Sequence, residues 1–233
     1  MLTKWLLRLL PVVLLAGMAA LPATAAHEPT KKELTTSVTN LKQIAIACHE
    51  YFDTTNRLPG NIYSKDGKPL LSWRVAILPY VEQEELYKEF KLDEPWDSAN
   101  NKKLIDKMPK LYAPVRVKAK AGETFYQTFT GKDALFGEKG PQYKISNIPD
   151  GTSNTALVVE AGEPVTWTKP ADLPFDQKKD LPKLGGLFDG EFHVGLCDGS
   201  VMRVKKDFDA QEMKNLIMPA DGNVIDLKKL QKK

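Results

Sequence analysis

The chain has 233 residues, of which 42% are hydrophobic and 27% charged, an ordinary composition for a globular protein. This length suits one domain and can bury a core without disulfides or a structural metal. The formal net charge of +3 includes Lys4 and Arg8 of the N-terminal segment, so the rest of the chain carries +1. That near-neutral balance does not favour a nucleic-acid partner, which needs a clustered basic face, and we expect none.

The first 26 residues have the pattern of a secretory signal peptide. The two basic residues precede an uncharged apolar run over 9–21, and Ala23 and Ala25 fit the small-residue cleavage rule. The run is shorter than the roughly 20 residues that a membrane-spanning helix needs. We therefore expect residues 1–26 to be removed on export, leaving a periplasmic or secreted protein, 27–233, without a transmembrane segment.

Residues 30–55 are predicted to form one long helix. Thr30 and Glu33 fit a capping box at its start, and Asn56 with Pro59 marks its end. Apolar residues recur at helical spacings of three and four, at Leu34, Val38, Leu41, Ile44, Cys48, Tyr51 and Phe52. This apolar stripe must pack against another layer of the protein.

Shorter elements follow the long helix. A helical region over 71–90 is divided by Pro79, and Asp97 or Ser98 can cap a third short helix that ends near residue 106. Strand patterns begin near residue 110. They are expected at 124–129, 156–160, 165–168, 192–197 and 201–205, and a last helix at 209–217.

Turn residues connect the predicted strands. Asp150 and Gly151 precede the buried run at 156, and Asp198 with Gly199 predicts a tight two-residue hairpin turn. The segment 169–183, rich in proline, aspartate and lysine, is expected to be a surface loop.

Helices that precede antiparallel strands imply an α+β fold with the long helix on one face of the sheet. We expect a single domain over 27–233, with a core at about 30–217. The polar tail, 218–233, is predicted to be solvated and partly frayed.

The two cysteines raise the possibility of one disulfide in an exported protein. Cys48 lies on the apolar stripe of the long helix, whereas strand alternation places Cys197 with His193, opposite Phe192. If the helix covers the Phe192 face, the two sulfurs cannot meet. Two buried thiols are therefore the favoured interpretation, and the pairing stays open.

Five segments between about residues 39 and 208 occur in the order found in one bacterial family. We single out the positions Trp73, Pro79, Pro95, Trp96, Asp97, Asp150, Gly151, Asn154, Glu160, Asp198 and Gly199. By these positions the chain resembles the domain-of-unknown-function 1559 family. The resemblance implies an exported, pseudopilin-like protein, with a long helix packed on an antiparallel sheet and short helices inserted between them. It implies no enzymatic activity.

The chain departs from this family at three places. A conventional signal peptide replaces the prepilin leader, so the apolar stem that packs pilins into fibres is missing. Phe188 stands where the family places a histidine ten residues before the Asp-Gly aspartate. Tyr112, Ala113 and Pro114 replace a stretch that usually contains a cysteine. These departures argue against assembly into a pilus-like filament.

No catalytic, cofactor-binding or metal-binding residue is assigned, and we expect no cofactor. His27, His49 and His193 have no metal-ligand spacing, and the acids near residue 95 lack the spacing of a calcium loop. A zinc site that joins Cys48, His49, His193 and Cys197 conflicts with the opposite faces predicted above. A hydrolase would draw on Glu160, Asp189 or Asp198, although turns explain the two aspartates better.

Three functions remain open from the sequence. We favour an exported, non-catalytic structural or interaction module that contacts other proteins of the bacterial envelope. The first alternative is a periplasmic protein that binds a small ligand or glycan between the Pro95–Trp96 loop and the sheet. The second is a carboxylate-based hydrolase that uses Glu160. A deep pocket would favour ligand binding, whereas an exposed apolar patch or an unpaired sheet edge would favour interaction with proteins.

Overall fold

The computed structural model describes residues 28–232, so the predicted signal peptide and His27 lie outside the described residues. The expected α+β class, with an N-terminal helix and antiparallel sheets, is confirmed. The central sheet has the strand order β10-β9-β7-β3, and each neighbouring pair is antiparallel. Its strands are β3 (Glu123–Gln127), β7 (Ala156–Thr166), β9 (Phe192–Leu196) and β10 (Val201–Val204).

Short elements surround this sheet. Between the long helix and β3 lie β1 (Ile62–Tyr63), β2 (Pro69–Leu71), α2 (Trp73–Ala76), η1 (Leu78–Val81), α3 (Glu84–Glu89), η2 (Asn101–Lys107) and η3 (Lys110–Tyr112). A second, irregular sheet contains β4 (Phe129–Thr130), β5 (Phe136–Gly137), β6 (Gly140–Pro141) and β8 (Leu173–Pro174). The remaining elements are η4 (Ile145–Asn147), η5 (Thr152–Asn154), α4 (Ala210–Ile217) and α5 (Leu227–Leu230).

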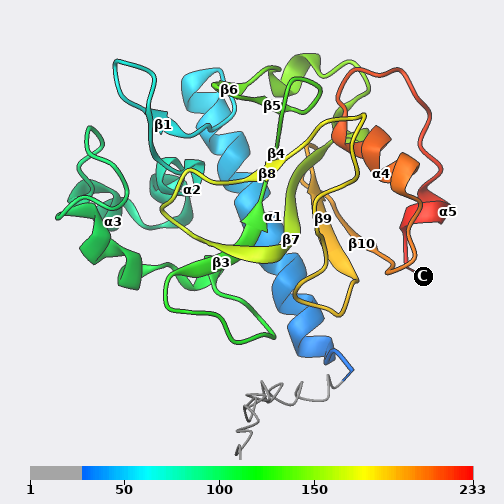
Figure 1. Cartoon of the computed structure of the whole chain (residues 1–233), viewed down its shortest axis with the longest axis horizontal. Helices are drawn as coiled ribbons and strands as arrows, with labels where there is room; N and C mark the ends of the chain where they lie inside the picture. The colour runs from blue at the N-terminus through cyan, green and yellow to red at the C-terminus, as the bar shows by residue number, and fades with distance from the viewer. Residues whose placement is uncertain (1–27, 233) are drawn as a thin grey trace, which may run out of the picture.

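The long helix, α1, spans Lys31–Thr55 and begins at the predicted capping box. Thr30 Oγ1 accepts a hydrogen bond from the Glu33 amide at 3.2 Å, and the Glu33 carboxylate accepts one from the Thr30 amide at 2.8 Å. Asn56, with a φ of 57°, ends the helix in the left-handed conformation that asparagine tolerates. Figure 1 shows α1 lying across the central sheet.

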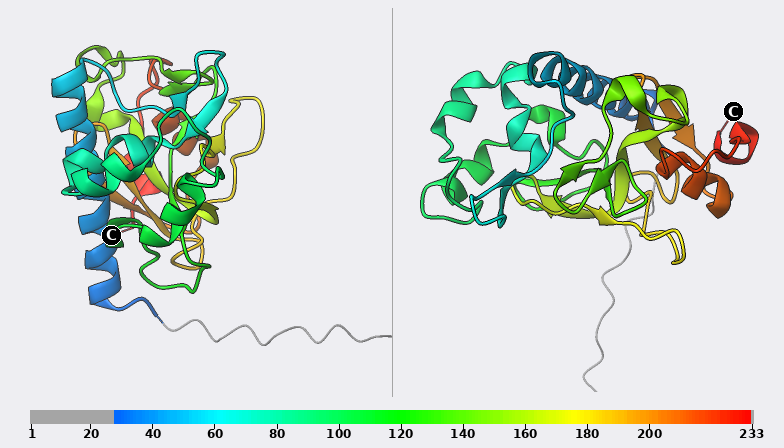
Figure 2. Two further views of the ribbon diagram at one scale, coloured as in Figure 1. Left: turned by 90° about the vertical axis from the view of Figure 1, so that its left-hand side faces the viewer. Right: turned by 90° about the horizontal axis from the view of Figure 1, so that it is seen from above.

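The two faces of the central sheet are covered by different helices. On one face, Phe192 and Val194 of β9 pack in a core with Met213 and Leu216 of α4. The other face carries His193 and packs against α1. Figure 2 shows α1 along one side of the molecule, with the short helices at one end and α4 and α5 at the other.

This arrangement corrects the assumption behind the cysteine prediction, which was that the long helix covers the Phe192 face. Because α1 covers the His193 face and not the Phe192 face, Cys48 and Cys197 lie in the same hydrophobic core. Both are buried free thiols. Burial raises the pKa of the Cys48 thiol to about 12, and it also raises the pKa of Cys197.

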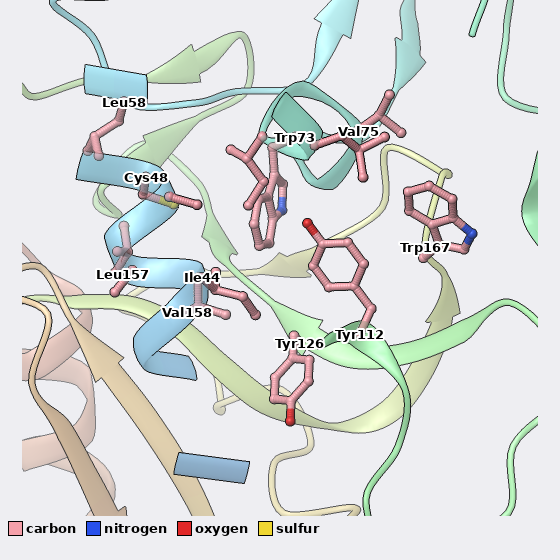
Figure 3. Close-up of a cluster of buried hydrophobic side chains, with 14 of the residues drawn as sticks. Ile44, Cys48, Leu58, Trp73, Val75, Tyr112, Tyr126, Leu157, Val158 and Trp167 are labelled. Carbon is pink, nitrogen blue, oxygen red and sulfur yellow. The ribbon is translucent and has the colours of Figure 1, made fainter. Parts of the chain in front are cut away.

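The α1-side core is built on aromatic side chains. Trp167 is fully buried, stacks on Tyr112 with ring centroids 5.8 Å apart, and meets the ring of Phe90 edge-on at 5.7 Å. Trp73 is buried in the same core. Figure 3 shows Trp73 and Tyr112 in this core near Ile44 of α1, with Trp167 farther from the helix.

The C-terminal segment is ordered against the sheet, so the prediction of a frayed tail is wrong for residues 227–232. The Leu230 side chain is fully buried in the core beneath α4. The Lys205 amide donates to the Leu230 carbonyl at 2.9 Å, and the Lys232 amide donates to the Arg203 carbonyl at 3.0 Å. The tail thereby covers the outer edge of β10, which would otherwise present unpaired backbone groups.

Candidate functional site

Two sets of buried charged side chains lie on either side of β3. The first contains Glu160, which the sequence singled out. The second contains Arg74 and Asp172, neither of which the sequence marked as functional. Buried charges are costly, so each set needs compensating partners.

The Glu160 set joins α1 to the central sheet. Glu160 and Ser37 are fully buried, and His193 is 2% exposed. The Ser37 hydroxyl donates to Glu160 Oε1. Glu160 Oε2 accepts from the His193 amide at 2.7 Å and lies 3.1 Å from His193 Nδ1. Ser37 Oγ also lies 3.0 Å from this ring nitrogen.

Tyr126 lies against this set. Its hydroxyl accepts a hydrogen bond from Asn40 Nδ2 at 3.2 Å. Burial raises the pKa of the Tyr126 phenol, and the nearby Glu160 carboxylate adds to the rise, whereas contacts with Asn40 and Ser37 oppose it. The phenol therefore stays neutral, and polar residues of α1 find their partners within the sheet.

These residues resemble a serine–histidine–acid triad in composition but not in geometry. A triad needs the acid on one imidazole nitrogen and the nucleophile on the other. Here Ser37 and Glu160 both approach Nδ1 of His193. The three side chains are also buried from solvent. The set therefore anchors α1 to β7 and β9 through hydrogen bonds.

The Arg74 set also meets β3 at Tyr126, through the carbonyl of that residue. Arg74 is fully buried and donates through Nε to the Tyr126 carbonyl at 2.8 Å, through Nη1 to Ser72 Oγ at 2.7 Å, and through Nη2 to Asp172 Oδ1 at 2.9 Å. Burial lowers the pKa of the guanidinium, and the Asp172 charge opposes that change. The hydroxyl of Tyr112 donates to the Arg74 carbonyl at 2.9 Å.

The two carboxylate oxygens of Asp172 have unequal surroundings. Oδ1 accepts from Arg74 Nη2, from Trp73 Nε1 at 3.1 Å and from the Thr128 amide at 3.0 Å. Oδ2 has no hydrogen-bond partner, even though it is buried in a side chain that is only 2% exposed. A small cavity of about 10 Å³ adjoins Asp172, Trp73 and Thr130.

A cleft of about 980 Å³ opens beside Asp172. It lies between the β1–β2 hairpin, the second sheet and the loop that follows β7. Its polar lining includes Asn61, Tyr63 and Thr130, and its rim carries charged residues of both signs. A neighbouring cleft of about 330 Å³ shares Asn61 and Tyr63 with it. The volume lies within the range of pockets that hold small molecules.

The 980 Å³ cleft does not lie beside the Pro95–Trp96 loop, where the sequence predicted a ligand pocket. The Trp96 amide donates to the Leu70 carbonyl at 2.8 Å, and Lys169 Nζ lies 5.5 Å from the centre of the half-buried Trp96 ring. Neither Pro95 nor Trp96 lines the 980 Å³ cleft, and Asp97 is exposed beside them. Pro79 lies in the first turn of η1. Of the singled-out residues, Trp73 reaches the cleft region through its contact with Asp172.

The turn residues have structural roles. Asp150 accepts hydrogen bonds from the amides of Asp221 and Gly222 at 2.8 and 3.1 Å, and its carbonyl accepts one from Asn154 Nδ2 at 3.0 Å. Gly151 has a φ of 87°. These contacts fix the entry to β7 against the segment that follows α4.

The β9–β10 hairpin differs from its prediction. Gly199 has a φ of 84°, but Asp198 does not have a positive φ. The Gly199 amide donates to the Leu196 carbonyl, and the Leu196 amide donates to the Ser200 carbonyl. The loop therefore has three residues with a left-handed glycine at its end, because a type I turn needs that glycine to rejoin the strands.

Within residues 28–232, no group of three or more histidine, cysteine or acidic side chains has the arrangement of a metal site. His193 engages Glu160 as described above, and His49 Nε2 lies 2.9 Å from the carbonyl of Cys197. In the same part of the chain, no helix combines the length and apolar character needed to cross a bilayer.

The fold and these contacts define an α+β module with a buried polar anchor and, within the part of the chain that the structure describes, an open cleft beside Asp172. Residues 35–117 match the family described as "Protein of unknown function (DUF1559)", which confirms the resemblance over that segment. The matched segment contains most of α1 and Arg74, whereas Asp172 and the family's C-terminal signature lie outside it. No curated protein and no solved structure matches the chain.

Proposed function

We propose that the chain is an exported, non-catalytic binding module of the bacterial cell envelope, and that it binds a small ligand in the cleft beside Asp172. The observation that carries this proposal is the buried Oδ2 of Asp172, an acceptor without a partner on a residue that lines a preformed cleft. Export is supported by the signal-peptide pattern of residues 1–26.

The contacts of Glu160 support a function without catalysis. A general acid or base must come within hydrogen-bonding distance of its substrate. Glu160 instead uses its oxygens on Ser37 and His193, and all three side chains are buried away from the cleft. A buried, fully partnered carboxylate of this kind stabilises the packing of α1 on the sheet.

Two features favour a small ligand over a protein partner. Among the described residues, the large exposed apolar side chains are Ile46 on α1 and Val224 and Leu227 near the C-terminus, three residues in all. The edge of β10 is paired with the C-terminal tail. The surface features that would favour docking of another envelope protein are therefore weaker than the cleft.

Fractionation of the tagged protein from its own bacterium tests this function. We expect a mature chain that begins near residue 27, fractionates with the periplasm or medium, and runs as a small species after mild crosslinking. A thermal-shift screen with sugars, ions and small metabolites should then raise its melting temperature. A large crosslinked envelope complex, together with no ligand-induced shift, would overturn the small-ligand function and favour the protein-interaction function.

A further inference from the structure

We infer that the cleft takes a neutral, hydroxyl-rich ligand, such as a short saccharide, and that Asp172 Oδ2 accepts a hydrogen bond from one of its hydroxyl groups. This inference rests on the proposed binding function and names the class of its ligand. It follows from the chemistry of Asp172, from the charge balance of the cleft and from the rigidity of its walls.

The first step concerns the hydrogen-bonding capacity of Asp172. Oδ1 already accepts three hydrogen bonds, from Arg74, Trp73 and Thr128, and these fix the plane of the carboxylate. Oδ2 is held beside the cleft with none. An ionised carboxylate oxygen only accepts hydrogen bonds, so the group that satisfies Oδ2 must be a donor. A hydroxyl, an amine or an amide of a ligand meets this requirement, whereas a phosphate or carboxylate does not.

The second step concerns charge. The buried guanidinium of Arg74 compensates the negative charge of Asp172 within 2.9 Å. At the rim of the cleft the charges of both signs are equal in number, with Lys132, Lys139 and Lys179 facing Glu138, Asp176 and Asp180. Such a site offers no net charge to attract a polycation or a polyanion. A neutral donor is therefore favoured over an ammonium group.

The third step concerns shape and preorganisation. Asn61 Oδ1 is fixed by the Trp73 amide at 2.9 Å, and the Tyr63 hydroxyl donates to the Glu138 carbonyl at 2.8 Å. Proline rings contribute rigid, apolar parts of the wall at Pro69, Pro170, Pro174 and Pro182. Rigid walls with a few fixed polar groups lower the entropic cost of binding. The adjoining 330 Å³ cleft leaves room for a second or third ring.

The test is a titration of the exported protein, followed by amide ¹H–¹⁵N spectra. The probes are maltotriose, cellotriose, laminaritriose and triacetylchitotriose, with putrescine as the cationic probe and citrate as the anionic one. At least one trisaccharide should shift the amides of Tyr63, Thr130 and Asp172 in a saturable manner. Putrescine and citrate should leave these amides unchanged.

Three variants separate the cleft from the rest of the surface. Ala171→Trp places a large ring on the wall of the cleft and should abolish the trisaccharide shifts. Ala99→Trp makes the same substitution at an exposed site beside Trp96 and should bind like the native protein. Asp172→Asn replaces the free acceptor by a donor and should weaken binding about tenfold. Asp172→Asn also removes the charged partner of Arg74. If this variant does not fold, Ala171→Trp alone tests whether the ligand binds in the cleft.

The outcomes distinguish the ligand class from the binding function. Putrescine or citrate shifts at these amides, without trisaccharide shifts, would overturn the saccharide class and leave small-ligand binding intact. Trisaccharide shifts that persist in Ala171→Trp would overturn the location. If none of the four trisaccharides shifts the cleft amides, the inference fails. The fractionation and thermal-shift experiment then judges the broader function independently.

Discussion

Replacing Arg74 by methionine removes a buried positive charge and keeps much of the side-chain volume. In the native protein the guanidinium makes hydrogen bonds to the Tyr126 carbonyl, the Ser72 hydroxyl and the Asp172 carboxylate. The variant leaves the Asp172 carboxylate without its cationic partner, with its side chain 2% exposed and only the neutral donors of Trp73 and Thr128. Removing one partner of a buried ion pair costs about 3–5 kcal/mol.

Urea unfolding at pH 7 measures this effect. With a urea dependence of about 1–3 kcal/mol per molar for small proteins, the unfolding midpoint should fall by at least about 1 M. The double variant Arg74→Met/Asp172→Asn should lose less free energy of unfolding than the sum of the two single variants, because it leaves neither charge unpaired. Lys88→Met removes an exposed ion pair with Glu84 and should leave the midpoint unchanged.

A loss below about 1 kcal/mol for Arg74→Met would refute this reasoning, since it is less than the cost of one buried unsatisfied group. Additive losses in the double variant would refute the coupling between Arg74 and Asp172 even if each single variant were destabilised. Equal unfolding slopes across the variants are the control that the denatured states are comparable.

Three further predictions concern other parts of the fold. Burial raises the pKa of Cys48 to about 12 and also raises that of Cys197. Iodoacetamide at pH 8 should therefore label both thiols only after unfolding. Labelling of the native protein would contradict their burial. Leu230→Ala should lower the free energy of unfolding by about 2–5 kcal/mol in urea, whereas Leu227→Ala at a partly exposed position should have little effect; equal small effects would indicate a frayed tail. Ser37→Ala should cost about 1–3 kcal/mol by removing a donor from buried Glu160, and an unchanged thermal transition would show that this hydrogen bond contributes nothing.

The elements predicted best from the sequence are those whose signals are local. The capping box of Thr30 and Glu33 and the left-handed Asn56 delimit α1 as expected, because each depends on residues within one or two helical turns. The hairpin at Asp198 and Gly199 was predicted as a hairpin but with the wrong loop. The Asp-Gly pair suits both a two-residue and a three-residue loop, and strand register decides between them.

The buried polar residues could not be found from local patterns. Ser37 and Asn40 lie among the apolar positions of α1, yet they are buried because Glu160 and Tyr126 meet them from strands far along the chain. The sequence singled out Glu160 but not its partners. No periodicity within α1 reports contacts with residues 86 and 123 positions away.

The cleft residue Asp172 was missed for a related reason. It lies in the segment 169–183, whose proline, aspartate and lysine content predicts a solvated loop, and about half of that loop is exposed. Arg74 draws Asp172 into the interior, but a buried arginine in a short helix gives no distinctive signal in the sequence. The contact between Arg74 and Asp172 therefore becomes visible only in the folded structure, where the segment 169–183 packs beside α2.

The most direct test of the account is a thermal-shift comparison of the native protein with Ala171→Trp and Ala99→Trp against one library of sugars and small metabolites. If the cleft beside Asp172 binds the ligand, compounds that raise the melting temperature of the native protein and of Ala99→Trp should have no effect on Ala171→Trp. Equal shifts in all three proteins, or no shift in any, would contradict a binding function for this cleft.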